Sequence, residues 1–343
     1  MSAFDSAYDF IWATVDDIDN IMRFIKNQWK SETILATSKD CFSFQYQNDK
    51  TINFILAINK KTGEIESISG FVQYSKDLLD IGPAVWLSKT KTEMPFLGVA
   101  TMRKMLELTN CRFWGAPGAN DDSTLILSKV FKKKVGTMKH FYMLSEHEDF
   151  KIAIVNNRPA AKNVPCHFTT EMNRVNHIGE LEGRFDFEYD ISRMPYKDKW
   201  FINNRYFKHP VYDYIIWTLG DEKHRYGGLM VAREVFYLDR KALKIIDYIG
   251  DLELLSGISP ALKGLLSDEG YEYIDLYCTG IPDEILYRAG FVLRDEKDPN
   301  TIPNHFEPFV QNNIEIQYNT SHESAIFFRG DSDRDRPYIW KLK

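Results

Sequence analysis

The sequence predicts an α/β fold made of two tandem halves, each with a mixed sheet of parallel and antiparallel strands. At 343 residues the chain is too long for one ordinary hydrophobic core, which favours two domains. Strand-like runs repeatedly precede helix-like runs, as in α/β proteins, while neighbouring strands also form hairpins. The second half then repeats the order of the first at a nearly constant offset of about 160 residues.

The first half, expected at 1–155, opens with an amphipathic helix at 16–29 whose apolar residues recur at helical spacing. Two apolar strands at 52–58 and 65–74 are expected to form a hairpin around the turn 59–64. The remaining expected elements alternate in type: a strand at 84–87, a helix at 98–108, a strand at 111–114, a helix at 123–130 and a closing strand at 135–144.

A polar, proline-containing stretch at 156–165 is expected to link the halves, and the second half then covers 166–343. Its expected elements follow the same order: strands at 213–217 and 229–235 around a turn at 220–227, a strand at 244–248, a helix at 252–266, a strand at 273–277, a helix at 283–289 and a strand at Phe291. At this offset Trp114 coincides with Tyr277, so both halves are expected to share one fold.

The composition excludes several classes of protein. The net charge of −6 without a basic stripe argues against nucleic acid as a partner, and no apolar stretch approaches the ~20 residues that cross a membrane. The N-terminus lacks the basic region of a secretory signal, and no metal-binding motif is present. The cysteines stand far apart, which predicts reduced thiols and a cytoplasmic protein: Cys41, Cys111, Cys166 and Cys278.

The segment 95–101 (PFLGVAT) carries the most informative local pattern. It joins a strand to a helix and places the small residues Gly98 and Ala100 at the helix start. A helix N-terminus offers unpaired backbone N–H groups and a positive dipole end, and small residues let a pyrophosphate approach them closely. Taken alone, the same residues also fit an ordinary turn between a strand and a helix.

This segment resembles the [QR]-x-x-G-x-[GA] loop of the GNAT acyltransferase superfamily, although Pro95 stands where Gln or Arg is usual. The resemblance implies two tandem GNAT-like domains and acyl-CoA as cosubstrate. It places the cofactor against Leu97, Gly98, Val99, Ala100, Thr101 and Asn120. In the second half, 251–257 (DLELLSG) puts two acids where a pyrophosphate would lie, so that half is expected to be a degenerate copy without a CoA site.

Many GNAT enzymes use a tyrosine as general acid on the leaving thiolate. Tyr287 in the second half matches that pattern (ILYRAGF, 285–291), whereas the first half has Ser128 at the corresponding place. The resemblance therefore makes Tyr287 a candidate general acid, and a packed aromatic residue in a degenerate copy fits equally well.

Three polar segments of the second half, 203–210, 304–308 and 330–337, offer further candidate contacts. Each could be a solvated loop, yet together they resemble tandem GNAT N-acyltransferases that modify nucleotide-linked amino sugars. Arginine suits phosphate and aspartate suits sugar hydroxyls. The resemblance implies a nucleotide-sugar site formed by Asn203, Asn204, Arg205, Tyr206, Phe306, Asp333, Arg334 and Arg336.

The implied reaction transfers an acyl group from acyl-CoA to the amine of a nucleotide-linked amino sugar, with dTDP as the expected nucleotide. It would belong to surface polysaccharide or O-antigen biosynthesis. A sugar amine is partly neutral near pH 7, so water can relay its proton. His209 is the candidate base if one exists and otherwise a residue that fixes its own loop. Two alternatives remain open: a non-catalytic module that binds CoA or a sugar nucleotide, and aminoacyl transfer from tRNA, which the absence of a basic groove disfavours.

Overall fold

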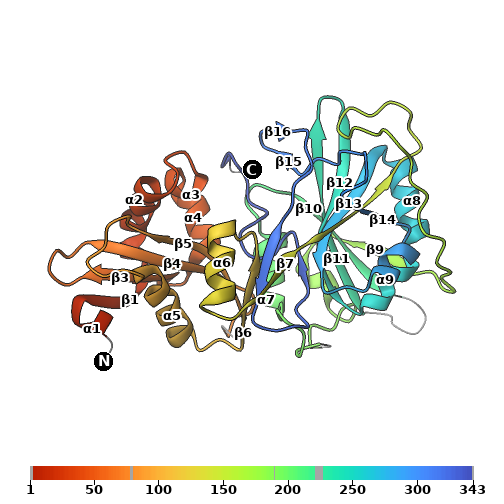
Figure 1. Cartoon of the computed structure of the whole chain (residues 1–343). Coiled ribbons are helices and arrows are strands. Elements are labelled where there is room, and N and C mark those ends of the chain that lie inside the picture. Colours follow the sequence, from red (N-terminus) through yellow and green to blue (C-terminus); the bar gives the residue numbers. More distant parts are fainter. Residues whose placement is uncertain (1–2, 78–79, 189, 221–226, 342–343) are drawn as a thin grey trace.

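Two large mixed sheets lie side by side in the computed structural model, which describes residues 3–77, 80–188, 190–220 and 227–341 (Figure 1). The predicted α/β class with mixed sheets is confirmed. Most of the turn expected at 220–227 lies outside the described residues. Within those ranges, no helix combines the length and the apolar character that crossing a membrane requires.

The first sheet has the strand order β1-β3-β4-β5-β6-β17-β7, with β2 added beside β3. Its members are β1 (Tyr8–Thr14), β2 (Gln47–Asn48), β3 (Thr51–Asn59), β4 (Ile65–Gln73), β5 (Asp80–Ser88), β6 (Phe113–Pro117), β7 (Lys134–Thr137) and β17 (Gln317–Thr320). Only β5 and β6 run parallel; the other neighbours are antiparallel.

The second sheet repeats this layout in the order β14-β8-β13-β12-β11-β10-β9, with β18 beside β13. Its members are β8 (Lys139–Leu144), β9 (Glu171–Val175), β10 (Tyr214–Gly220), β11 (Gly228–Tyr237), β12 (Arg240–Gly250), β13 (Tyr271–Thr279), β14 (Val292–Arg294) and β18 (Phe327–Phe328). Here β12 and β13 form the parallel pair. A small hairpin of β15 (His305–Phe306) and β16 (Phe309–Val310) stands apart.

The two halves exchange strands. β8 follows the first half in the chain but lies between β13 and β14 of the second sheet. β17 comes from the second half but lies between β6 and β7 of the first sheet. The single strand expected at 135–144 is therefore wrong, because the chain passes from one sheet to the other at Met138. Each sheet thus needs the other half of the chain for completion.

Helices cover both faces of the first sheet. On one face, α5 (Leu97–Thr109) packs Met102 and Met105 against Phe71 and its neighbours. On the other face lie α2 (Ile18–Gln28), α3 (Ile34–Thr37) and α4 (Lys39–Tyr46). The other first-half helices are α1 (Ala3–Ala7), the 3₁₀ turn η1 (Val15–Asp17) and α6 (Asp121–Lys129).

The second sheet carries α8 (Ser259–Asp268) and α9 (Asp283–Arg288) on one face. The expected helix at 252–266 is divided into the 3₁₀ helix η4 (Leu252–Gly257) and α8, because Pro260 cannot donate a helical hydrogen bond and is favoured in a first turn. The remaining elements are η2 (Ile178–Leu181), α7 (Lys199–Ile202) and the π-turn η3 (Asn203–Phe207).

A buried ion cluster fixes the chain after β18. The Nζ atom of Lys197 lies 2.6 Å from Asp247 and 2.7 Å from Asp331, and both carboxylates are fully buried. The side chain of Asp331 also accepts a hydrogen bond from the backbone N–H of Phe328. Burial raises the pKa of Asp331 to about 6, against the lowering effect of Lys197 and with a further increase from the charge of Asp247.

The strand exchange predicts that the first half does not fold alone. A fragment of residues 1–155 lacks β17, which leaves facing edges of β6 and β7 unpaired, and its β8 has no sheet to join. We expect this fragment to show no cooperative unfolding transition by circular dichroism, and co-expression with residues 156–343 to restore one. A fragment that unfolds cooperatively alone at the melting temperature of the full chain would contradict the exchange.

The buried cluster predicts a specific pH dependence of stability. Because the pKa of Asp331 is raised on folding, its contribution to the free energy of unfolding is present below pH ~4 and is lost as the pH rises through about 6. We expect the wild-type stability, measured relative to Asp331→Asn by urea denaturation, to fall by on the order of 3 kcal/mol between pH 4 and 7. A flat or rising difference for Asp331→Asn would refute the cluster's role.

Candidate functional site

A gap opens between the parallel strands β5 and β6 of the first sheet. Their pairing consists of Asp80 with Phe113 and Ile81 with Trp114, although β5 continues to Ser88. β5 stays paired with β4 to its end, and β6 stays paired with β17. The carboxyl ends of β5 and β6 therefore diverge, and ligands of α/β sheets bind at such ends.

A β-bulge lies in β5 at the gap. Ser69 of β4 pairs with Trp86 and Phe71 pairs with Pro83, so Ala84 and Val85 together face one residue of β4. A bulge leaves one residue outside the ladder and re-aims its backbone groups, and such bulges are common next to active sites. Since Pro83 has no N–H, the backbone N–H groups of Ala84 and Val85 are the donors that β5 can offer at this point.

In the second sheet, the chain's own backbone fills the corresponding gap. Pairing of β12 with β13 ends at Ile245 and Leu276, and β18 then pairs with β13 while Gly330 N–H donates to the Ile246 carbonyl at 2.8 Å. The chain just before α8 is covered as well, because Thr170 N–H donates to the carbonyl of Gly257, the last residue of η4, at 3.0 Å. The chain's own backbone thus fills both positions in the second half.

Beyond β18 the chain crosses to the gap of the first sheet. Ser332 is fully buried, has φ +56°, and its Oγ donates to the carbonyl of Pro83 on β5 at 3.2 Å. Two residues later, the side chain of Arg334 occupies the space beside Gly118, directly after β6, that a Cβ atom there would need. The segment 331–336 thus lies across the mouth of the gap and contacts both diverging strands.

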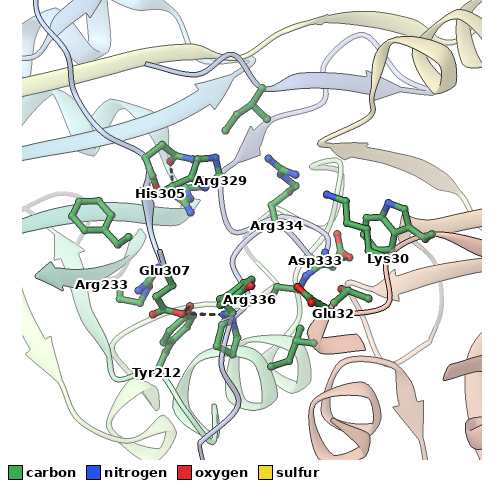
Figure 2. Close-up of a pocket in the computed structure, with 18 of the residues that line it drawn as sticks. Lys30, Glu32, Tyr212, Arg233, His305, Glu307, Arg329, Asp333, Arg334 and Arg336 are labelled. Atoms are coloured by element: carbon green, nitrogen blue, oxygen red, sulfur yellow. Dashed lines mark hydrogen bonds and ion pairs between the residues drawn. The ribbon is translucent and has the colours of Figure 1, made fainter. Parts of the chain in front are cut away.

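A pocket of about 740 Å³ adjoins this segment (Figure 2). Its walls come from the loop 29–34 after α2, from 304–307, and from 329–338 near the C-terminus. Four aromatic side chains line it: Trp29, Tyr212, Phe306 and Tyr338. Both halves therefore contribute to one cavity.

The pocket carries an excess of positive charge. Five cationic side chains line it, Lys30, Arg233, Arg329, Arg334 and Arg336, against the three carboxylates Glu32, Glu307 and Asp333. Arg233 is paired with the buried Asp335 at 2.9 Å, Arg329 lies 3.8 Å from the same oxygen, and Arg336 is paired with Asp333. Burial alone would raise the pKa of Asp335, but the charges of Arg233 and Arg329 hold it far below its ordinary value.

The side chains of Arg334 and Lys30 form no ion pair or hydrogen bond with any residue that the structure describes, although the Lys30 ammonium lies 5.9 Å from the centre of the Trp29 ring. The Nε atom of Arg334 is buried without an acceptor among these residues. Figure 2 shows the Arg334 side chain between Arg329 and Asp333. Burial lowers the pKa of Arg334; Asp333 opposes this effect, and Arg329 adds to it. An anion bound here would offset the burial of this guanidinium.

The structure divides the predicted substrate residues between two pockets. Phe306, Asp333, Arg334 and Arg336 line the 740 Å³ pocket. Asn204 and Arg205 line another pocket, of about 520 Å³. Asn203 and Tyr206 are absent from both linings, and the Tyr206 hydroxyl donates to Asp247 at 2.6 Å within the buried ion cluster.

Neither candidate catalytic side chain lines these pockets, although the ring of His209 packs against Tyr212 of the larger pocket and Phe44 of the smaller one. His209 is buried, and its Nδ1 accepts the backbone N–H groups of Val211 and Tyr212 at 3.1 and 2.9 Å. His209 thus fixes its own loop through Nδ1, and its role as a base stays a prediction. Tyr287 packs in the second core beside Phe141, with Lys162 above its ring, and its role as general acid stays a prediction.

The expected CoA-binding segment begins helix α5 as predicted, and Ala100 lies half-buried in its first turn. Leu97 and Thr101 are buried, and Val99 is half-buried. Gly98 is packed closely, since its carbonyl accepts from Trp86 Nε1 at 2.8 Å and a Cβ atom would lie 2.7 Å from Ser88 Oγ. Asn120 is the N-cap of α6, where its side chain accepts from Ser123 N–H at 2.8 Å, and cofactor contact by these residues stays a prediction.

Several residues of the site escaped the sequence analysis. Lys30 and Glu32 belong to a polar run directly after a helix, which looks the same as a solvated loop. Ser332 lies inside the polar segment 330–337, but nothing local indicated that it would be buried against β5. One local feature of the sequence could have predicted the bulge: Pro83, followed by the small residue Ala84, lies within a strand.

Among the described residues, no cluster of three or more His, Cys, Asp or Glu side chains could hold a metal ion. The four cysteines are free thiols, two of them buried.

Comparison with solved structures identifies the fold, although the sequence matches no protein-family profile and no curated protein. A GCN5-related N-acetyltransferase from Anabaena variabilis matches with a TM-score of 0.52 at 8% identity, over 91% of this chain and 72% of that chain. A GCN5-related N-acetyltransferase from Kribbella flavida (TM-score 0.48, 9% identity, 92% and 71% covered) and the N-myristoyltransferase of Saccharomyces cerevisiae (TM-score 0.44, 7% identity, 94% and 81% covered) were also found. The chain has the GNAT fold.

Proposed function

We propose that this protein is an N-acyltransferase that moves an acyl group from acyl-CoA to the amine of a nucleotide-linked amino sugar. One observation carries the proposal: the unpartnered Arg334 lies where a large polar pocket meets the gap between β5 and β6. An anionic acceptor held there would reach an acyl group in the gap. The free cysteines suit a reducing compartment, so we place the reaction in the cytoplasm, in surface polysaccharide biosynthesis.

The first half supplies the site for acyl-CoA in this proposal. The first turn of α5 offers backbone N–H groups to the pyrophosphate, since Phe96 at the N-cap makes no side-chain cap there. The pantetheine arm would lie along the unpaired edge of β5, whose backbone groups are available where β6 diverges. One site per chain follows, because β18 and Thr170 occupy the corresponding positions of the second half.

The 740 Å³ pocket supplies the acceptor site in the proposal. Its volume suits a small-molecule ligand of nucleotide-sugar size. Arg334 and Lys30 suit the diphosphate, Trp29 or Phe306 a base stacked on its ring, and Glu32 a sugar hydroxyl. A dTDP-linked amino sugar is the first acceptor to test.

The chemistry requires orientation more than a strong base. The neutral amine attacks the thioester carbonyl carbon, and the electron pair moves to the carbonyl oxygen, which a backbone N–H of Ala84 or Val85 at the bulge would stabilise. The intermediate then collapses, the C–S bond breaks and the thiolate leaves. The amine proton passes to water. A strong protein base is not required, because alignment of the reactants alone lowers the activation barrier by on the order of 7–11 kcal/mol.

The cosubstrate site predicts an effect of charge at the start of α5. Ala100→Glu places a negative charge beside the pyrophosphate and should weaken CoA binding at least tenfold, while the neutral Ala100→Gln of the same size should weaken it less. Isothermal calorimetry should give one site per chain for the wild type. Two equivalent sites, or equal effects of both variants, would contradict this assignment.

The acceptor site predicts a selective effect of Arg334. Arg334→Gln should raise the KM for a dTDP-linked amino sugar about tenfold or more and leave the KM for acyl-CoA nearly unchanged, because the guanidinium binds phosphate. Arg334→Lys keeps the charge and should recover part of the loss. Steady-state kinetics with each substrate varied in turn provides the measurement, and equal changes in both KM values would show that Arg334 is misplaced.

A further inference from the structure

The 520 Å³ pocket lies between the halves and is separate from the proposed acceptor site. α4, β2 and the ends of β3 and β4 form its first-half wall, and α7 with η3 forms its second-half wall. Its lining consists of Ser43, Phe44, Gln45, Gln47, Asp49, Asn53, Val72, Gln73, Trp200, Phe201, Asn204, Arg205 and Lys208. None of these residues lines the 740 Å³ pocket.

The segment 333–336 lies between the two pockets. Asp333 lines the larger pocket and accepts from the hydroxyl of Tyr46 on α4 at 3.2 Å. The backbone carbonyl of Asp335 accepts from Arg205 at 2.9 Å, while the Asp335 side chain is paired with Arg233 of the larger pocket. One ligand in each pocket can therefore bind without displacing the other.

Side-chain amides dominate the lining of the smaller pocket. Five lining residues are amides: Gln45, Gln47, Asn53, Gln73 and Asn204. Part of their hydrogen-bonding capacity is used within the protein: Gln73 accepts from Asn48 and donates to a backbone carbonyl, Gln47 Nε2 donates to the backbone carbonyl of Asp49, and Gln45 Oε1 accepts from Arg205. The remaining amide donors and acceptors match a ligand whose groups both donate and accept, as hydroxyl groups do. The partly exposed ring of Trp200 offers a flat apolar surface beside them.

Two buried atoms of this lining have unmet hydrogen-bonding capacity. Asn53 is 4% exposed and Arg205 is 5% exposed, and both Asn53 Oδ1 and Arg205 Nε lack a partner among the described residues. The terminal nitrogens of Arg205 donate to Gln45 Oε1 at 3.0 Å and to a backbone carbonyl. The pocket therefore lacks one donor for Asn53 and one acceptor for Arg205, which a ligand can supply.

The charges add a further requirement. Arg205 and Lys208 are the cations of the lining and Asp49 is its anion, so one positive charge is in excess. Arg205 and Lys208 form no ion pair with a carboxylate among the described residues. A ligand with a single acid group would balance this charge and would accept the hydrogen bond of Arg205.

We propose that this pocket is a second ligand site, which binds a polyhydroxylated molecule with one acid group, either a sugar phosphate or a sugar acid. The hydroxyl groups pair with the remaining amide donors and acceptors, among them Asn53 Oδ1. The acid group pairs with Arg205 and Lys208, and a face of C–H groups packs on Trp200. A nucleobase fits less well, because its few polar groups lie in one plane while amides surround the pocket on both walls.

The test measures direct binding to the full chain. Isothermal calorimetry with glucose 1-phosphate and with glucuronate should each give one site per chain, whereas glucose and inorganic phosphate should each bind at least tenfold more weakly than the better of the two. Glucose binding as tightly as both acids would overturn the acid requirement, and tighter binding of uridine than of either acid would overturn the ligand class. Failure of both acids to bind at 10 mM would overturn the site.

Variants locate the binding. Asn204→Ala and Lys208→Ala change side chains with at least partial exposure, and each should weaken binding of the preferred acid at least tenfold. Arg334→Gln in the larger pocket is the matched control and should leave this affinity within about twofold. The opposite pattern, with loss only in Arg334→Gln, would assign the ligand to the larger pocket. Because no acyl transfer is measured, failure of the proposed enzymatic function would leave this result unaffected.

Discussion

The parting of β5 and β6 is the constraint on which the site depends. Two residue pairs join these strands, and beyond them β6 stays paired with β17 while β5 stays paired with β4. β17 is in turn paired with β7, so a strand from the other half of the chain completes the sheet on the β6 side of the gap. The bulge in β5 lies on the other side, so both halves of the chain form the borders of the gap.

The same constraint separates the roles of the two halves. In the second sheet the equivalent opening is filled by β18, and the chain that leaves β18 is fixed by Lys197 before it reaches β5 and Gly118. The chain from β18 to residue 336 thus fills the gap of the second sheet and then forms a wall at the gap of the first sheet. Burial of Asp331 opposes folding at neutral pH. The same turn of the chain that buries Asp331 also brings Ser332 and Arg334 to the gap of the first sheet, so the free-energy cost and the placement of these residues occur together.

Local sequence patterns predicted the helices and strands, but they did not predict which distant strands pair with one another. The helix expected at 98–108 is α5 at Leu97–Thr109, because apolar periodicity and a strand–helix turn are local features. The run 135–144 was expected to be one strand, and nothing in it indicates that Met138 separates two sheets. The polar run around Arg334 was recognisable from composition, but Arg205 lies in the other pocket because η3 directs it toward α4.

Both pockets contain a guanidinium that folding removes from water without a complete set of partners. Arg334 has none among the described residues, and Arg205 has two acceptors but no carboxylate. Burying such charges costs free energy. At Arg205 burial acts to lower the pKa, but the surrounding tyrosines and aspartates raise it overall, whereas at Arg334 burial prevails and the pKa is lowered. A bound anion adds a favourable interaction in the folded state only, so each ligand stabilises the chain. Since the segment 333–336 contacts both arginine sites, the two binding events act on one shared wall.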